Sequence, residues 1–287
     1  MADQEEHRPA SDEEISKLPS LARQMPRLVM PLGAMIDSFC ESPGIARNRK
    51  LMDFFDAVKS AFPDEGYSAI QREHLSQENV EFMLRSKMLS LEHKYLDLPY
   101  WVHSKFSTGS LLGLGRYAGQ DILDLGAGPA HFGLVARHFG CRYTGLDVQS
   151  FSWTPATRRH LYDDLCGFFG IERVFRTIAP FKPLSVPGRF RLVTCLMGNF
   201  CSYKPVAGAP RKPWDWPEWV FLLDDLASNQ LTADYDMYFH ISRDYLPDAV
   251  TANLRVFAKT FDEERSVFTF DQALDLEALR RSVPEAR

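Results

Sequence analysis

The sequence has few cysteines and no paired-cysteine pattern. Its five cysteines are an odd number, and no two of them form a C-x-x-C pair. An odd set without close pairs predicts neither a disulfide framework nor a zinc site. We therefore expect buried, reduced thiols in a cytoplasmic protein, and no bound metal. The cysteines are Cys40, Cys141, Cys166, Cys195 and Cys201.

A long apolar run is also missing. Charged residues interrupt every hydrophobic stretch before it reaches the roughly 18 residues of a membrane-spanning helix. The first residues, Met1 to His7, are acidic and polar, whereas a secretory signal begins with a positive segment followed by an apolar one. These absences predict a protein that is neither exported nor placed in a membrane.

Basic residues are not in excess. The chain of 287 residues has 33 Lys and Arg against 38 Asp and Glu, for a net charge of -5 and a pI near 5.9. Proteins that bind nucleic acid need clustered positive charge to neutralise phosphates, so we expect no nucleic-acid partner. With 45% hydrophobic and 25% charged residues, the chain can bury a large core.

Apolar residues recur at helical spacing through the first hundred residues. This pattern predicts a disordered tip at residues 1–10 and a helical cap at residues 11–98. The predicted features of the cap are a helix start with a capping box at Ser11–Glu14, helices within Leu28–Phe39, Leu51–Phe62 and Val80–Leu98, a cap for the last helix at Ser76, and a break at Pro63 and Gly66.

Residues 99–287 are expected to form a second domain, and from Asp121 onward short apolar runs alternate with helical segments. This alternation predicts an α/β domain with a Rossmann-like, doubly wound and mostly parallel sheet. The predicted strands are Asp121–Leu125, Arg142–Asp147, Arg173–Ile178, Leu192–Met197, Tyr235–Ile241 and Val267–Phe270. The predicted helices are Ala130–Phe139, Ala156–Phe169, Trp216–Leu231 and Asp248–Phe261.

The most informative segment is a predicted strand that runs through a glycine turn into a helix, at residues 121–131. Gly126 and Gly128 allow a ligand to approach the backbone closely, and the following helix presents free N–H groups. A nucleotide-like ligand suits this arrangement. A nicotinamide or flavin site needs a third small residue in G-x-G-x-x-G/A, where this chain has His131, and the acid Asp124 before the glycines favours a cationic ligand instead.

The segment Asp124-Leu-Gly-Ala-Gly-Pro129 resembles motif I of the class I S-adenosylmethionine-dependent methyltransferases, D/E-x-G-x-G. Ala130 stands where many members have a third glycine. About twenty residues on, Asp147 ends the next predicted strand, where the resemblance implies an acid that accepts hydrogen bonds from both ribose hydroxyls. The alternative is a plain glycine turn with Asp147 as a helix cap. The resemblance covers roughly Lys94–Ile241 and implies S-adenosyl-L-methionine as the cofactor.

Two later strands match the family less closely. The acid that often follows the third strand is absent, and Arg191 replaces the usual Asp of the fourth strand, F-D-L-V. Lys105 is expected to pair with the carboxylate of the cofactor, with a solvated lysine as the alternative. The cofactor-binding residues that the resemblance implies are Lys105, Asp124, Gly126, Ala127, Gly128, Pro129, Asp147, Val148, Ile178, Ala179 and Met197.

The acceptor-side residues are less well defined. His240 is expected near the carboxyl end of the fifth strand, where ligands of open α/β sheets bind, and is the candidate base. A buried structural histidine is the alternative. Asn199 and Tyr203 follow the fourth strand and are the other catalytic candidates, and the N-P-P-Y/F motif of amino-group methylation is absent.

We therefore predict a methyltransferase that acts on a small molecule or a sugar-like metabolite. The N-terminal helices are expected to contribute to the acceptor pocket, with a packed cap or a homodimer surface as the alternative. Two other functions stay open. One is a nicotinamide-dependent oxidoreductase, and the other is a binding protein that retains the fold without turnover.

Overall fold

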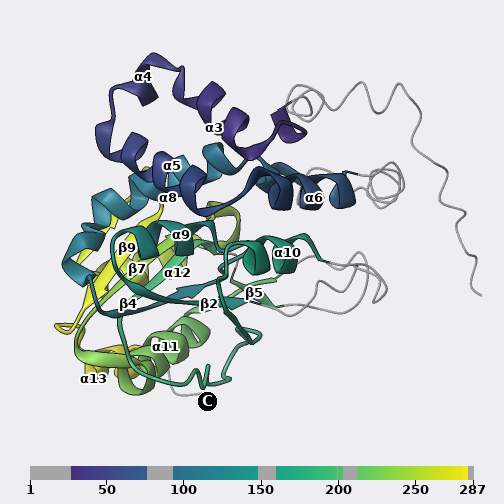
Figure 1. Ribbon diagram of the computed structural model, residues 1–287. Helices are drawn as coiled ribbons and strands as arrows, with labels where there is room; N and C mark the ends of the chain where they lie inside the picture. The colour runs from purple at the N-terminus through teal and green to yellow at the C-terminus, as the bar shows by residue number, and fades with distance from the viewer. Residues whose placement is uncertain (1–26, 76–92, 148–159, 199, 203–211, 284–287) are drawn as a thin grey trace, which may run out of the picture. The chain divides into compact units, whose positions relative to one another are not determined.

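The computed structural model describes residues 27–75, 93–147, 160–198, 200–202 and 212–283, which are coloured in Figure 1. The chain divides into two compact units. The first contains the chain up to Leu112 together with residues 129–138 and 154–171. The second contains residues 113–128, 139–153 and 172–287. Among the described residues, no helix has both the length and the apolar character needed to cross a membrane.

The first unit is helical, as the spacing of apolar residues predicts. In the helix Arg49–Ala61, Leu51, Phe54, Phe55 and Val58 are buried. The Asn48 side chain caps this helix by accepting a hydrogen bond from the Leu51 N–H at 3.2 Å. The helices are α3 (Leu32–Cys40), α4 (Pro43–Ala46), α5 (Arg49–Ala61), α6 (Asp64–His74), a 3₁₀ turn (His93–Leu96), α8 (Leu98–Leu112), α9 (His131–His138) and α10 (Leu161–Phe168).

Buried polar side chains connect distant segments of this unit. The Tyr67 hydroxyl in α6 donates a hydrogen bond to the Leu96 carbonyl at 2.7 Å, and His74 lies 2.7 Å from the Asp164 carboxylate in α10. Gln71 donates to the Leu28 carbonyl at 2.6 Å. Because buried polar groups are costly without partners, these bonds fix α6 against its neighbours.

The second unit is built on a seven-stranded sheet with the order β3-β2-β1-β4-β7-β9-β8. The first five strands in this order, β3, β2, β1, β4 and β7, pair in parallel, whereas β9 is antiparallel to both β7 and β8. The strands are β1 (Asp121–Leu125), β2 (Arg142–Asp147), β3 (Arg173–Phe175), β4 (Phe190–Gly198), β7 (Leu231–Ile241), β8 (Thr260–Asp262) and β9 (Val267–Asp271). In a separate two-stranded sheet, β5 (Cys201–Ser202) pairs antiparallel with β6 (Lys212–Pro213).

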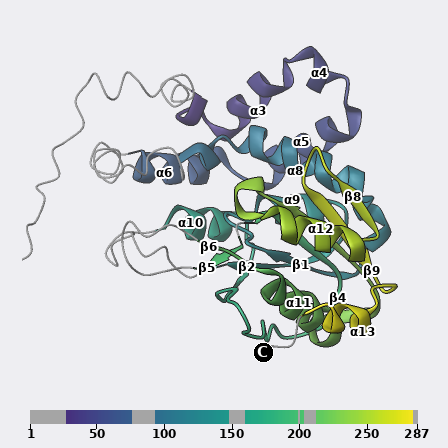
Figure 2. The same ribbon diagram turned by 180° about the vertical axis from the view of Figure 1, so that it is seen from behind.

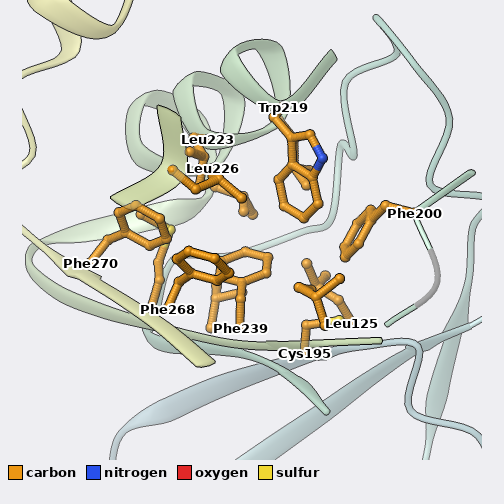
Figure 3. Close-up of a cluster of buried hydrophobic side chains, with 14 of the residues drawn as sticks. Leu125, Cys195, Phe200, Trp219, Leu223, Leu226, Phe239, Phe268 and Phe270 are labelled. Atoms are coloured by element: carbon orange, nitrogen blue, oxygen red, sulfur yellow. The ribbon is translucent and has the colours of Figure 1, made fainter. Parts of the chain in front are cut away.

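One face of this sheet carries a large apolar core. Figure 3 shows Trp219, Leu223 and Leu226 facing strand residues that include Phe239 and Phe268. Burial of such aromatic and aliphatic surface is the main stabilising contribution to the unit. The helices of the unit are a 3₁₀ turn (Leu114–Tyr117), α11 (Trp216–Asp225), a π-helical turn (Leu226–Gln230), a 3₁₀ turn (Arg243–Tyr245), α12 (Asp248–Phe257) and α13 (Leu276–Arg281). Figure 2 shows α11 and α13 on the same side of the sheet.

The connection from β3 to β4, residues 176–189, contains no helix although all of it is described. It covers the core by inserting the side chains of Leu184 and Val186 into the apolar cluster. The Asp225 carboxylate at the end of α11 accepts a hydrogen bond from the Leu184 N–H at 2.9 Å and another from Asn229 at 2.9 Å. A buried carboxylate therefore holds an irregular segment in the place of a helix.

Arg191, which departs from the family pattern, has a defined partner. Its guanidinium lies 2.7 Å from the Asp236 carboxylate on the neighbouring strand β7. The same carboxylate accepts a hydrogen bond from the Tyr117 hydroxyl at 2.7 Å. Burial and this bond raise the pKa of Tyr117 to about 12. Arg191 therefore belongs to an ion-paired network at the amino-terminal edge of the sheet.

Each predicted strand is found, and β1 and β2 match residue for residue. The helix predicted for Ala130–Phe139 is also found, one residue shorter at each end, as α9. The third predicted strand was too long, because β3 ends at Phe175. The helix predicted for Asp248–Phe261 is wrong beyond Phe257, where the chain turns and forms β8. Similarly, the helix predicted to Leu231 ends in a π-helical turn, and Leu231 begins β7.

The break predicted at Pro63 and Gly66 is confirmed at Pro63, which precedes α6, but it does not extend to Gly66, because this glycine lies within α6. A Cβ atom at Gly66 would lie 2.7 Å from the Phe168 ring, so the residue is small for packing rather than for a turn. In the helix predicted for Val80–Leu98, residues 93–96 form a 3₁₀ turn and Leu98 begins α8. Three predicted features lie outside the described residues. They are the capping box at Ser11–Glu14, the features predicted for residues 76–92, and the first part of the helix predicted for Ala156–Phe169.

The end of β4 gives a test of this packing. A Cβ atom at Gly198 would lie 2.8 Å from the Phe200 ring and would also overlap Cys195 Sγ. We expect Gly198→Ala to reduce the free energy of unfolding by about 1–3 kcal/mol, measured by urea denaturation. Gly115→Ala is the control, because no described residue beyond its chain neighbours has an atom within 4 Å of its Cβ position. Equal stability of the two variants would contradict the packing.

Candidate functional site

The glycine turn follows β1 directly and has an unusual backbone. Gly126 has a φ of 72° and Gly128 a φ of 55°, which are left-handed conformations that glycine adopts without strain. The N–H groups of Gly126 and Ala127 donate to the Leu146 carbonyl at 2.8 and 3.0 Å. Apart from its two chain neighbours, no atom of the described residues lies within 4 Å of the position that a Cβ of Gly126 would take. The turn is therefore fixed to β2 and leaves open space beside Gly126.

Ala130, at the end of the turn, is also left-handed, with a φ of 56°. A non-glycine residue in this region is strained by about 1 kcal/mol, and such strain is common at functional sites. This conformation gives a physical reason for the third glycine of the family motif at this position.

Asp124 lies under the turn as a buried carboxylate. It is 3% exposed and accepts hydrogen bonds from the Thr194 hydroxyl at 2.7 Å and the Tyr143 hydroxyl at 2.9 Å. These donors come from β4 and β2, so Asp124 connects β1 to both of its neighbours. Neither donor was predicted from the sequence. Tyr143 and Thr194 have no local signal of their role, because 19 and 70 residues separate them from Asp124.

Asp147, at the end of β2, reaches the turn. Its Oδ2 atom accepts a hydrogen bond from the Gly128 N–H at 2.5 Å. The sheet therefore brings together the acid and the two glycines that the motif singles out. Arrangements of this kind, a glycine turn beside an acid at the end of the next strand, bind the ribose of nucleotide-like ligands. The open space beside Gly126 and the Asp147 carboxylate next to the Gly128 N–H fit such a ligand.

Other predicted site residues of the second unit lie at the carboxyl ends of its strands. Met197, near the end of β4, is 54% exposed and has a φ of 69°. Ile178 and Ala179 follow β3 and are half-buried. Their exposure and position agree with a ligand crevice at this edge, where the strand order reverses between β1 and β4.

His240 lies on the same face of the sheet as the two acids. On β4 and β7, His240 is paired with Leu196, and two residues earlier Tyr238 is paired with Thr194. Thr194 is also paired with Asp124 on β1. Because side chains alternate between faces, this register places His240 on the face of Asp124 rather than on that of the apolar core. The side chain is half-buried.

The remaining predicted residues lie elsewhere. Lys105, in α8, and Pro129, just before α9, belong to the first unit. Val148, Asn199 and Tyr203 lie outside the described residues. Among the residues that the structure describes, no group of three or more His, Cys, Asp or Glu could hold a metal ion.

His131 begins α9 and is a buried imidazole in the first unit. It is 2% exposed, the rings of Tyr95 and Phe169 flank it, and its Nε2 atom has no hydrogen-bond partner among the described residues. Burial, together with the charge of Lys105, lowers the pKa of His131 to about 3. The imidazole is therefore neutral at physiological pH.

The sheet has the Rossmann-like fold that the resemblance to class I methyltransferases predicts. The evidence is the sheet order, with the glycine turn after β1 and the acid at the end of β2. No family model matches the chain, and no curated protein matches it.

Solved structures of methyltransferases do match it, at low identity. N-methyltransferase NodS from Bradyrhizobium japonicum WM9 is 15% identical, with a TM-score of 0.39, over 59% of this chain and 94% of NodS. CalS10, an amino pentose methyltransferase from Micromonospora echinaspora, is 14% identical, with a TM-score of 0.34, over 52% of this chain and 54% of CalS10. The chain spans about half the length of several structures it matches.

The shifted pKa of His131 predicts a specific pH dependence. In the unfolded chain the imidazole titrates near 6.5, so below that pH the unfolded state binds a proton that the folded state does not. Between pH 7 and pH 5 this difference is expected to reduce the free energy of unfolding by about 2 kcal/mol. In His131→Phe this decrease in the free energy of unfolding should be absent, while the pH dependence that comes from other titratable groups remains. Parallel stability profiles of the two proteins in urea denaturation would contradict the burial of a neutral imidazole.

Proposed function

We propose that this chain is an S-adenosylmethionine-dependent methyltransferase that acts on a small-molecule or sugar-like acceptor. The observation that carries the proposal is the glycine turn of residues 126–128, with open space beside Gly126 and the Asp147 carboxylate bonded to the Gly128 N–H. The turn lets a nucleoside approach the backbone, and Asp147 is placed to accept hydrogen bonds from ribose hydroxyls.

When bound, S-adenosylmethionine supplies a methyl group on a positively charged sulfur, which makes that methyl electrophilic. The chain's own part is mainly positioning and the exclusion of water. The hydrogen bonds from Thr194 and Tyr143 to Asp124 fix β1, from which the turn leaves, to β4 and β2, and Asp147 is proposed to bind the nucleoside. Lys105 is proposed to pair with the carboxylate of the cofactor, and Met197 to line its methionine part.

The residues proposed to act on the methyl acceptor are chosen by their position in the sheet. His240 is proposed as a general base for an acceptor hydroxyl, because it lies near the carboxyl end of β7 on the face of Asp124. Asn199 and Tyr203 are the alternatives, and the N-terminal helices are proposed to complete the acceptor pocket. The absence of a nucleic-acid partner, the homodimer and the cytoplasmic location stay predictions.

A nicotinamide-dependent oxidoreductase is the second candidate, and the geometry favours it less. Its motif needs a small third residue for close packing of helix and strand, and this chain places the buried ring of His131 there. Separate titrations with S-adenosylhomocysteine and NADH distinguish the two functions. A binding protein without turnover would bind S-adenosylhomocysteine but methylate none of a panel of hydroxyl and amine acceptors.

The cofactor site is tested by Asp147→Ala. The change removes charge-assisted contacts to the ribose, so S-adenosylhomocysteine binding should weaken by about 1.5–3 kcal/mol, measured by calorimetry. Asp121→Ala is the control, because it removes a carboxylate at the opposite end of the sheet, where Asp121 pairs with the exposed Arg142. Unchanged affinity in folded Asp147→Ala protein would reject the assignment.

The role of His240 is tested by His240→Gln. Loss of a general base should reduce turnover of a hydroxyl acceptor about a hundredfold, while the affinity for S-adenosylhomocysteine stays nearly constant. His103→Gln, which changes a histidine of the first unit, should leave turnover unaffected. If turnover in His240→Gln falls by less than a few-fold, His240 has no part in proton transfer.

A further inference from the structure

The peptide groups of Gly128 are held from two sides. Its N–H donates to Asp147 Oδ2 at 2.5 Å, and its carbonyl accepts a hydrogen bond from Arg173 Nη1 at 3.1 Å. The two side chains come from β2 and β3, while Gly128 belongs to the turn after β1. Side chains of two different strands thus fix one glycine, and both bonds lie within the second unit.

The register of the strands explains how Arg173 reaches the turn. Arg173 pairs with Gly145 on β2, and Gly145 pairs with Asp124 on β1, so the three positions share one face of the sheet. Since β2 lies between β3 and β1, the Arg173 side chain has to cross β2 to reach Gly128. Gly145 offers no side chain at the crossing, and a Cβ atom there would lie only 2.9 Å from Ala127 Cβ.

The guanidinium of Arg173 also contacts the ring of Phe175. Its Cζ atom lies 5.2 Å from the centre of the Phe175 ring, two residues along the same strand and on the same face. A planar guanidinium can stack on a ring and donate hydrogen bonds in its plane at the same time, which an ammonium group cannot do. The residue type therefore suits a fixed position rather than a solvated charge.

We propose that Arg173 is a positioning residue for the nucleoside site: it holds the Gly128 carbonyl, so that the turn keeps its left-handed conformation when the Asp147 carboxylate engages a ligand hydroxyl. The proposal rests on the proposed function for the identity of the ligand. Without Arg173, the turn would lose the hydrogen bond to the Gly128 carbonyl, while the Asp147 carboxylate, which accepts from the Gly128 N–H, would also have to bind the ligand. The bond from Arg173 does not use the ligand-binding carboxylate, so it can hold the turn while Asp147 engages the ligand.

The test compares Arg173→Ala with Arg176→Ala. Each removes one positive charge from the segment around β3, but the Arg176 guanidinium donates to the neighbouring Phe175 carbonyl at 3.1 Å rather than to the turn. Two quantities are measured in each protein. These are the amide exchange rate of Gly128 without ligand, by NMR, and the affinity for S-adenosylhomocysteine, by calorimetry. The free energy of unfolding is recorded alongside.

For Arg173→Ala we expect Gly128 exchange at least tenfold faster and affinity about tenfold weaker, with Arg176→Ala like the parent protein. Arg173→Lys keeps the charge and N–H donors but not the planar guanidinium, so it should restore part of both losses. It is the variant to measure if Arg173→Ala does not fold. Restoration of affinity by lysine without any change in global stability separates positioning from a purely structural role.

Three outcomes overturn the proposal. The first is Gly128 exchange in Arg173→Ala equal to that in Arg176→Ala. The second is faster exchange with unchanged affinity, which would make Arg173 structural only. The third is equal affinity loss in both variants, which would reflect charge alone. If the parent protein binds no S-adenosylhomocysteine, the proposed function fails, and unchanged Gly128 exchange would still reject the role of Arg173.

Discussion

The buried carboxylate of Asp124 is the constraint on which the proposed nucleoside site depends. An unpaired charge in this position would cost several kcal/mol, so the fold has to supply the Thr194 and Tyr143 hydroxyls at hydrogen-bond distance. A slip of β4 by one residue would turn Thr194 to the apolar face and remove its hydrogen bond to Asp124. The requirement thus selects the strand register, and the register in turn places the glycine turn and Asp147.

Local sequence patterns predicted the parts of the fold that are decided locally. The strands β1 and β2 are short apolar runs bounded by turn residues, and their ends were found residue for residue. The edge strand β8 was missed because its three residues continue the helical spacing of α12, and only pairing with β9 makes them a strand. Gly66 was interpreted as part of a break because the Phe168 ring, which packs against it and leaves no room for a side chain, lies about a hundred residues away in the sequence.

The same division holds for the site. The motif identified Gly126, Gly128 and Asp147, which the sheet brings together, because turn chemistry and the strand-end acid are visible in the sequence. Arg173 was missed, since its bond to Gly128 arises only when β3 is placed beside β2. Lys105 was chosen for its place in the chain before the turn, and the structure assigns it to the other unit. Long-range pairing, rather than residue type, limits such predictions.

The position of β9 has a consequence for how the protein is made. This strand lies between β7 and β8, and β8 has no other partner in the sheet. During synthesis on the ribosome, β8 therefore has nothing to pair with until Val267–Asp271 has left the exit tunnel, and the edge of β7 stays uncovered until then. A message truncated shortly before this strand would cost the sheet two strands rather than one, and its product would present an open apolar edge to chaperones and proteases.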